Sequence, residues 1–501
     1  MPGMAIAPSD LSVSRDTFDS TDPGSGVLVG TFGVDGPAEV LAAVARARTA
    51  AAWWQDLGCE GRARRLNAFK GILARGADEV CDLIHRENGK PHADAFTEVL
   101  LSLDHIAWAA GHAGRVLRPR RVPSGTLAMN HRAQVVYHPL GVVGVIGPWN
   151  YPLFTPMGSI IYALAAGNAV VFKPSEYTPA VGRWLADAFR TVVPEYPVLQ
   201  VVTGYGPTGA ALCAAGVDKL SFTGSAATGR RVMAACAENL TPVLLELGGN
   251  DAMVVDADAD LDAAANAAVW GSLQNAGQAC VSIERVYVHT AIYDRFVDKV
   301  ALLASAVDAG SGEQAQIGPI TMPRQVDVIA RHLDDAIARG ARAVVGSADA
   351  VHPPYVDPVV LVDVAPDSLI LHEETFGPIL PIVRVADADE AVAKANAGPY
   401  GLASAVFGKA HDDAIARRLR AGMTSVNSVV TFAMVPSLPF GGVGDSGFGR
   451  IHGPDGLKEF VRSQAITSQR FALPVELASF TRPARTLDVL KAVTRLRHGR
   501  R

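Results

Sequence analysis

The sequence has few cysteines and no metal-binding pattern, which excludes two classes of protein. The number of cysteines is odd and no two form a CxxC pair, which argues against a disulfide framework and against a zinc site. The thirteen histidines contain no HxxxH pair, so we expect no bound metal. Free thiols fit a reducing compartment, and we expect a cytoplasmic protein. The five cysteines are Cys59, Cys81, Cys213, Cys236 and Cys280.

Charge and long apolar runs are also scarce. Charged residues make up 19% of the chain and the net charge is −5, with no basic stripe outside the extreme C-terminus, so we expect no nucleic-acid partner. Gly167 and Asn168 interrupt the longest apolar run, 160–172, well short of the roughly eighteen residues of a membrane span. The first 22 residues lack an apolar segment after a basic start, and no signal peptide is expected.

Short apolar runs alternate with helical patterns from residue 142 onward. Runs of this kind are typical of strands that are buried on both faces of a parallel sheet. The pattern therefore predicts an α/β fold with a doubly wound parallel sheet, which binds ligands at the carboxyl ends of its strands. The expected strands are 142–146, 169–172, 199–202, 219–222 and 243–247, and the expected helices are 154–166, 179–192, 207–215, 226–238 and 261–275.

Three glycine-containing loops are candidates for phosphate binding. GxGxxG occurs at 204–209 and at 442–447, but neither has the full context of a dinucleotide loop, and ordinary tight turns explain both better. The segment 222–230 is a better candidate because it leaves a strand and enters a helix. Gly224 permits close approach of a ligand to the backbone, and Ser225 can cap a helix whose N-terminus favours an anion. A plain helix cap explains the segment equally well.

Three further motifs carry reactive side chains. Two prolines flank Asn150, and a rigidly held amide suits an oxyanion donor, although a structural turn is the simpler reading. Glu246 lies inside an apolar strand, where burial raises a carboxyl pKa toward that of a general base; a buried glutamate with satisfied hydrogen bonds is the alternative. Cys280 lies in a loop, where a lone cysteine is usually inert.

The order and spacing of these motifs resemble the aldehyde dehydrogenase superfamily over about residues 17–470. The resemblance adds the segment 372–378 (HEETFGP) and the segment 438–450 to the motifs above. It implies an aldehyde dehydrogenase-like fold in which the parallel-sheet cofactor domain is joined by an α/β catalytic domain and a small β oligomerisation element. The implied divisions are 1–121 with 142–248 for the cofactor domain, 249–460 for the catalytic domain, 122–141 with 461–470 for oligomerisation, and 471–501 for a basic tail.

The resemblance assigns chemistry to three residues. Cys280 is the implied nucleophile, which forms a thiohemiacetal and then a thioester with the aldehyde. The amide of Asn150 and the backbone N–H of Cys280 would hold the oxyanion, and Glu246 would activate the water that cleaves the thioester. Because relatives that transfer the acyl group to coenzyme A can lack this glutamate, Glu246 favours hydrolysis. A coenzyme-A-acylating enzyme and a binding protein that has lost catalysis remain alternatives.

The resemblance also implies a cofactor site for NAD, with NADP less favoured. Glu176 resembles the carboxylate that accepts from the adenosine ribose and repels a 2′-phosphate. Glu374 and Phe376 resemble the residues beside the nicotinamide. The expected cofactor-binding residues are Trp149, Lys173, Ser175, Glu176, Gly224, Ser225, Gly229, Leu247, Glu374 and Phe376.

The chain departs from many relatives near the substrate. Ser159 and Ile451 stand where those relatives carry a lysine and a glutamate, which implies that their proton-relay pair is absent. Gly158 replaces a frequent aromatic residue and, with Gln274, suggests a wider or more polar tunnel. The sequence does not distinguish between succinic semialdehyde, aromatic aldehydes and longer aliphatic aldehydes as the substrate. The candidate tunnel walls are Tyr151, Gln274, Phe432, Met434 and Phe440.

The sequence also makes predictions about oligomerisation and about the C-terminal tail. The segments 133–138 and 464–468 resemble the family's oligomerisation strands, and we expect a homodimer or homotetramer. Apolar residues recur every three positions from Leu487 to Leu496 among basic ones, which predicts a basic amphipathic helix. A helix packed on protein, or a loose tail, is favoured over contact with a membrane surface.

Overall fold

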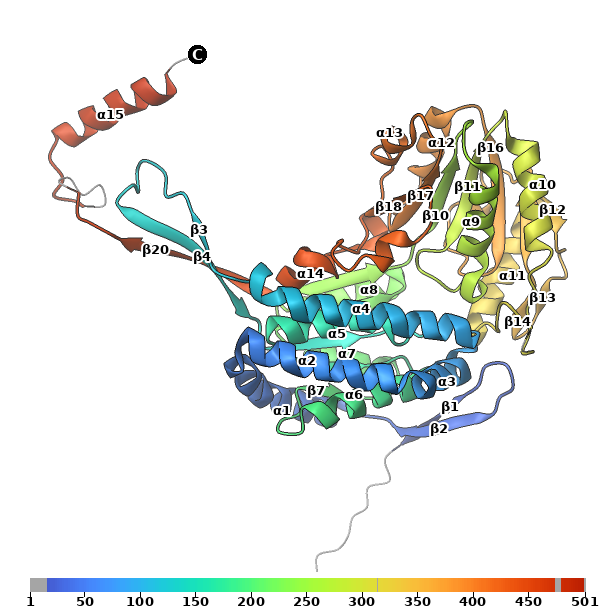
Figure 1. Ribbon diagram of the computed structural model, residues 1–501, viewed down its shortest axis with the longest axis horizontal. Helices are drawn as coiled ribbons and strands as arrows, with labels where there is room; N and C mark the ends of the chain where they lie inside the picture. Colours follow the sequence, from blue (N-terminus) through green and yellow to red (C-terminus); the bar gives the residue numbers. More distant parts are fainter. Residues whose placement is uncertain (1–15, 313, 474–478, 500–501) are drawn as a thin grey trace, which may run out of the picture. The chain divides into compact units, whose positions relative to one another are not determined.

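The computed structural model describes residues 16–312, 314–473 and 479–499, and they form two compact units (Figure 1). The larger unit is Met1–Val116 with Pro139–Val461, and the smaller is Leu117–His138 with Arg462–Arg501. The absence of a signal peptide was predicted mainly from residues 1–15, which lie outside the described part. The domain divisions given above stay predictions.

The N-terminal part of the larger unit is a hairpin followed by four helices. The first helix begins with Pro37 at its first position, and the side chain of Glu39 accepts a hydrogen bond from the N–H of Gly36 (3.0 Å). Its buried residues recur at helical spacing, so one face packs inward. The elements are β1 (Thr17–Thr21), β2 (Leu28–Gly33), α1 (Pro37–Asp56), α2 (Gly58–Arg75), α3 (Ala77–Asn88) and α4 (His92–Val116).

A six-stranded sheet follows, in the order β19-β9-β8-β5-β6-β7. All neighbours pair in parallel except β19 with β9, which confirms the predicted doubly wound sheet. Helices α5 and α6 pack on strands of this sheet, and α2 packs on α5 and α6. Helices α1, α7 and α8 also contact the strands and form a second group, in which α7 contacts both α1 and α8. The elements are β5 (Val142–Ile146), α5 (Phe154–Ala166), β6 (Ala169–Lys173), α6 (Pro179–Val192), β7 (Leu199–Val201), α7 (Gly206–Ala214), β8 (Lys219–Gly224), α8 (Ala226–Ala237), β9 (Val243–Leu247), β19 (Gly447–Phe448) and α14 (Gly453–Glu459).

A seven-stranded sheet forms the other half of the larger unit, in the order β12-β15-β16-β11-β10-β17-β18. Its strands are parallel except β12, which runs antiparallel to β15. Its strands are β10 (Asp251–Val255), β11 (Ile283–His289), β12 (Arg342–Val345), β15 (Val359–Val362), β16 (Ile379–Val385), β17 (Ala403–Phe407) and β18 (Met423–Val426). A hairpin is made by β13 (Val351–His352) and β14 (Tyr355–Val356), and the helices are α9 (Leu261–Leu273), α10 (Tyr293–Ala304), α11 (Pro323–Ala338), α12 (Ala388–Ala395) and α13 (Asp412–Ala416).

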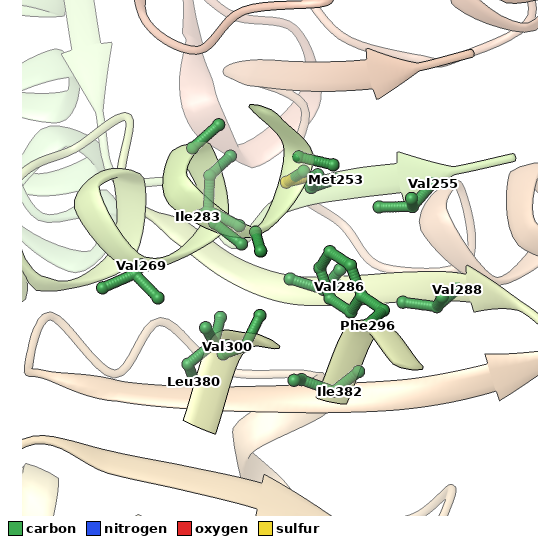
Figure 2. Close-up of a cluster of buried hydrophobic side chains, with 14 of the residues drawn as sticks. Met253, Val255, Val269, Ile283, Val286, Val288, Phe296, Val300, Leu380 and Ile382 are labelled. Carbon is green, nitrogen blue, oxygen red and sulfur yellow. The ribbon is translucent and has the colours of Figure 1, made fainter. Parts of the chain in front are cut away.

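An apolar core fixes α9 and α10 against this second sheet. Figure 2 shows Phe296 of α10 beside Val286 and Val288 of β11, with Ile382 of β16 nearby, and all four side chains are fully buried. Burying a phenylalanine contributes about 1.5–3 kcal/mol, so this one ring stabilises the layer strongly. The core holds the loop between α9 and β11, which carries Cys280, on a rigid base.

The smaller unit contains a three-stranded sheet in the order β20-β4-β3 and a helix. The two strands predicted at 133–138 and 464–468 are confirmed as strands, each somewhat longer than expected. The tail helix is also confirmed, and Leu487, Val493 and Leu496 are exposed on it. No helix in the described ranges has the length and apolar character that crossing a membrane requires. The elements are β3 (Arg120–Val122), β4 (His131–Pro139), β20 (Val461–Gln469) and α15 (Arg485–His498).

Candidate active site

Cys280 lies after a tight reversal of the chain. The predicted helix 261–275 ends earlier, at Leu273, because Asn275, Ala276 and Gly277 all have positive φ (51°, 56° and 74°). A side chain at Gly277 would stand 2.2 Å from the carbonyl oxygen of Gly377, so only glycine fits there. This short 3₁₀ segment, η1 (Gln274–Gly277), turns the chain so that Cys280 precedes β11. Strain of this kind is typical of functional loops.

Asn150 is held directly beside the cysteine loop. Its Nδ2 donates to the carbonyl oxygen of Gln278 at 3.0 Å, and its side chain is buried. The side chain of Asn275 donates to the backbone oxygen of Asn150 at 3.1 Å, so the two loops are tied in both directions. Gln278 is itself fixed, because its Oε1 accepts from the N–H of Thr321. The structure therefore brings Asn150 and Cys280 together from positions 130 residues apart.

A buried ion pair clamps the loop that carries Asn150. Lys90 Nζ lies 2.8 Å from Glu98 Oε2 and donates to the backbone oxygen of Asn150 at 2.7 Å. Glu98 Oε1 accepts from the N–H groups of Leu153 and Phe154. Both charged side chains are fully buried, and removal of one would leave the other without its partner. The sequence analysis missed this pair, although a glutamate among the apolar positions of α4 was a detectable signal.

Glu246 lies at the carboxyl end of β9 and is 3% exposed. Its Oε1 has no hydrogen-bond partner among the described residues, and it lies 2.6 Å from where a side chain on Gly441 would begin. Burial raises the pKa of Glu246 well above 4.5, and the positive charge of Arg450 offsets part of this effect. A buried carboxyl oxygen without a partner is costly to maintain, and such groups are frequent at functional sites.

The electrostatic surroundings of Cys280 are negative. Burial raises the pKa of its thiol above the usual range, and the carboxyl groups of Glu246, Asp251 and Glu374 raise it further. Glu246 is thus near enough for its charge to act on the sulfur. This environment favours the protonated thiol, whereas a nearby positive charge would favour the thiolate.

Glu374 and Phe376 lie in a turn that reaches toward the same place. Glu374 Oε1 accepts from the N–H of Gly249 at 2.8 Å, directly after β9, and burial raises its pKa to about 8. The buried Glu284, which the sequence analysis missed, accepts from the N–H groups of Thr375 and Phe376 and fixes the turn. The ring of Phe376 meets Trp149 edge-on at 5.5 Å. The turn therefore links β9 to the loop after β5.

The segment predicted to hold phosphate forms a strand-to-helix turn. Ser225 is the N-cap of α8, and its side chain accepts from the N–H of Thr228 at 3.3 Å. A side chain on Gly229 would stand 2.6 Å from Leu247 Cδ2, so glycine lets α8 pack against the end of β9. Gly224 and Ser225 remain accessible at the open end of the helix, where unpaired N–H groups favour an anion.

The proposed ribose-binding group lies at the end of β6. Lys173 is buried, its Nζ donates to the oxygen of Pro174 and lies 3.8 Å from Glu176 Oε2, and burial lowers its pKa. The hydroxyl of Ser175 accepts from the N–H of Tyr177. Gly209, the last glycine of the first GxGxxG motif, packs next to the Lys173 side chain. The ammonium keeps N–H groups for a ligand, because one carbonyl and one distant carboxylate do not use all three.

Comparison with known proteins places these motifs in one family. Residues 11–466 match the model of the aldehyde dehydrogenase family. The chain is 38% identical over 465 residues, 92% of this chain and 87% of the other, to a Methylomonas protein named 4,4'-diapolycopene aldehyde oxidase.

The chain belongs to the aldehyde dehydrogenase family.

Two further relatives agree with this placement. A Mycobacterium ulcerans protein, provisionally named succinate-semialdehyde dehydrogenase [NADP(+)] 2, is 36% identical over 91% of this chain and 89% of its own length. A crystal structure of an NAD-dependent aldehyde dehydrogenase from Sinorhizobium meliloti has a TM-score of 0.88 at 32% identity, over 93% of each chain. The family oxidises aldehydes with NAD or NADP, and the fold predicted from the resemblance is confirmed.

The candidate tunnel residues divide into two groups. Tyr151 donates its hydroxyl to Gln274 Oε1 at 2.6 Å, and the ammonium of Lys90 lies 3.8 Å from the centre of its ring. Phe440 is buried with its ring centre 6.1 Å from that of Phe432. Met434, in the 3₁₀ segment η3 (Thr431–Met434), is 44% exposed. Their role as tunnel walls stays a prediction.

Gly158 does not open the space that its small size suggested. A side chain there would begin 2.7 Å from His452 Nε2 and 2.8 Å from Ile451 Cδ1, so these two residues fill the space beside the glycine. The expected widening therefore does not follow from Gly158. His452 is buried, its ring centre lies 3.9 Å from that of His105, and neither of its ring nitrogens has a partner among the described residues. The sequence analysis missed this histidine.

The hydroxyl group of Ser159 already has a hydrogen-bond partner within the fold. Its hydroxyl lies 2.7 Å from that of Ser221, and both side chains are buried. Ser159 is thus bonded to β8 and does not supply the charged group that many relatives carry at this position.

Proposed function

We propose that this chain oxidises an aldehyde to the carboxylic acid, with NAD as the preferred cofactor, through a covalent intermediate on Cys280. The observation that carries the proposal is the 3.0 Å hydrogen bond from Asn150 Nδ2 to the oxygen of Gln278. It fixes the amide beside the loop of Cys280 and uses only one of its two N–H groups. The other N–H remains for a substrate.

In the proposed reaction the Cys280 thiolate attacks the aldehyde carbon. The free N–H of Asn150 and the backbone N–H of Cys280 donate to the oxyanion that forms, and one such donor is worth about 10²–10³ in rate. The cofactor, when bound, supplies a positively charged ring that accepts the hydride. Positive charge near Cys280 lowers the pKa of a thiol that three carboxyl groups otherwise raise.

Glu246 then removes a proton from the water that attacks the thioester. Its burial raises its pKa, so the carboxylate is a stronger base than an exposed glutamate. The lysine and glutamate of many relatives are replaced here by Ser159 and Ile451, so Glu246 would instead release its proton to water that is hydrogen-bonded to backbone carbonyl groups. We assign hydrolysis rather than transfer to coenzyme A on the presence of this glutamate.

The described residues fit a dinucleotide. The helix N-terminus at Ser225, with Gly224 before it, suits the pyrophosphate, and Lys173 with Glu176 suits the adenosine ribose. Gly229 and Leu247 support that turn, and Ser175 supports the ribose group. Trp149, Glu374 and Phe376 lie together beside the loop of Asn150 and suit the nicotinamide end. The Glu176 carboxylate repels a 2′-phosphate, which favours NAD over NADP.

The decisive experiment replaces Cys280 by alanine. We expect aldehyde-dependent NADH formation to be lost, with NAD binding retained in a calorimetric titration, and the exposed Cys59→Ala variant serves as the matched control with activity unchanged. Product analysis with and without coenzyme A separates hydrolysis from acyl transfer. Oxidation at the wild-type rate by Cys280→Ala would refute the mechanism.

Assembly and location form part of the same proposal. The sheet of β20, β4 and β3 offers strand edges, and exposed edges pair with another chain, so we propose a homodimer or homotetramer. The free cysteines favour the cytoplasm. Light scattering on the purified protein measures the number of subunits.

A further inference from the structure

A cavity of about 890 Å³ lies in the larger unit, between the start of α4 and α9. It is of the size that holds a small ligand. Its walls come from the β1–β2 turn, the α3–α4 turn, α9 and the loop that follows α10. The residues that matter for the argument are Asp22, His92, Asp94, Trp270 and Gln274.

Tyr151 adjoins both the wall of the cavity and the loop of Asn150. Gln274 lines the cavity and accepts the hydroxyl of Tyr151 at 2.6 Å. Tyr151 follows Asn150 directly, and its pKa is raised by burial and by the charges of Asp94 and Cys280 among others. Tyr151 is therefore near both the catalytic thiol and the acidic wall of the cavity.

The charge of the cavity is one-sided. Among the described lining residues there are two carboxylates, Asp22 and Asp94, and no lysine or arginine. Asp22 uses Oδ1 to accept from the N–H groups of Gly24 and Ser25, whereas no hydrogen bond or ion pair to the Asp94 side chain occurs among the described residues. Burial raises the pKa of Asp94, and the charge of Lys90 offsets part of this rise, but Lys90 is paired with the buried Glu98 and does not line the cavity.

The polar groups around Asp94 do not reverse this charge. His92 Nε2 lies 3.0 Å from Asp82, and His85 Nδ1 lies 2.7 Å from the backbone oxygen of Lys90, so each ring has a partner of its own. The Nε2 of Gln274 has no partner among the described residues, which adds a neutral hydrogen-bond donor. A carboxylate in this cavity would meet Asp22 and Asp94, and the described lining residues include no lysine or arginine to compensate them.

We propose that this cavity is the subsite for the distal end of the aldehyde and that it selects a chain ending in a cationic group over one ending in a carboxylate. The selection rests on the proposed function, because it concerns the far end of the same substrate. Asp94 is the specificity-determining residue, since neither of its carboxylate oxygens has a hydrogen-bond partner among the described residues, whereas Asp22 already uses one of its two. This selection disfavours succinic semialdehyde.

The test compares matched aldehydes of four to eight carbons that end in a trimethylammonium, a methyl or a carboxylate group. For wild-type protein with NAD we expect kcat/KM to be highest for a trimethylammonium aldehyde and lowest for the carboxylate of the same length. Asp94→Asn should lower the cation-to-anion ratio about tenfold, and Asp94→Arg should invert it. Asp334→Asn removes an exposed carboxylate of α11 that neither lines the cavity nor pairs with a residue that does, and it should leave the ratio unchanged.

The outcomes separate the two proposals. Turnover of the methyl-ended aldehydes reports on the proposed function, and the ratio reports on the subsite. Calorimetric binding of the corresponding acids to the wild-type protein repeats the comparison without turnover. Equal kcat/KM values or equal affinities for the two charged series, or a ratio that Asp94→Asn does not move, would overturn the subsite proposal.

Discussion

The cofactor side and the substrate side of the site are built differently. On the cofactor side, the phosphate-binding turn is held by close packing and by a local hydrogen bond. Gly229 lets α8 pack against Leu247, and the side chain of Ser225 caps α8. On the substrate side, Glu246 and His452 are buried with polar atoms that have no partner among the described residues. Each such atom costs about 1–3 kcal/mol. The cofactor side is less uniform than this contrast alone suggests, because the buried hydroxyl of Thr178, close to Glu176, also lacks a partner among the described residues.

The largest effect on activity is expected from a change at Glu246, on the substrate side. Glu246→Gln keeps the shape but removes the base, and we expect steady-state turnover to fall about 10²–10⁴-fold. Because hydride transfer precedes hydrolysis, one equivalent of NADH should still form in a rapid burst, which stopped-flow absorbance measures. Loss of the burst together with turnover would place the role of Glu246 before the thioester.

The same residue sets the pH dependence of hydrolysis. Burial raises the pKa of Glu246 well above 4.5, so the carboxyl holds its proton to a higher pH than an exposed glutamate does. The deacylation rate should therefore fall as the pH drops through this raised pKa. A pH profile without that fall would contradict the assignment.

The next largest effect is expected on stability, from a substitution at Gly158, which packs against His452. Gly158→Ala forces its new methyl group against His452 and Ile451, and we expect a loss of about 1–3 kcal/mol in the free energy of unfolding. In a His452→Gly background the same substitution should cost less than about half as much. Urea denaturation of the four proteins completes the cycle. An equal cost in both backgrounds would show that the two residues are not coupled.

A smaller effect is expected at the ribose-binding group. Glu176→Gln removes the charge that opposes a 2′-phosphate, and the ratio of kcat/KM for NAD over NADP should fall about tenfold, or about 1.4 kcal/mol. Asp187→Asn, on the exposed face of α6, is the control and should leave the ratio unchanged. A wild-type preference for NADP would refute the assignment of Glu176.

The smallest effect concerns the helix cap. Ser225→Ala should cost about 1 kcal/mol of stability and also weaken NAD binding, because the cap lies at the proposed pyrophosphate site. Asp260→Ala removes the cap of α9, away from the cofactor residues, and should cost stability alone. Equal NAD affinities for the two variants would show that Ser225 does not contribute to NAD binding.

Much of the fold could be predicted from the sequence because its signals are local. The run 142–146 is buried throughout and pairs in parallel with β6 and β8, as its unbroken apolar character indicated. The cap at Ser225 was likewise predictable from four consecutive residues. The helix 261–275 was predicted too long, because the reversal at Asn275 follows from close approach to Gly377, which lies far away in the sequence.

The sequence by itself determined the alternation of strands and helices, the family, and which residue types are available for chemistry. Only the tertiary structure decided that Lys90 and Glu98 clamp the Asn150 loop, that His452 fills the space beside Gly158, and that Asp94 lies in the wall of a cavity. The physical reason is range: apolar periodicity and caps depend on neighbouring residues, whereas packing volume and electrostatic compensation depend on whichever distant groups the fold brings together.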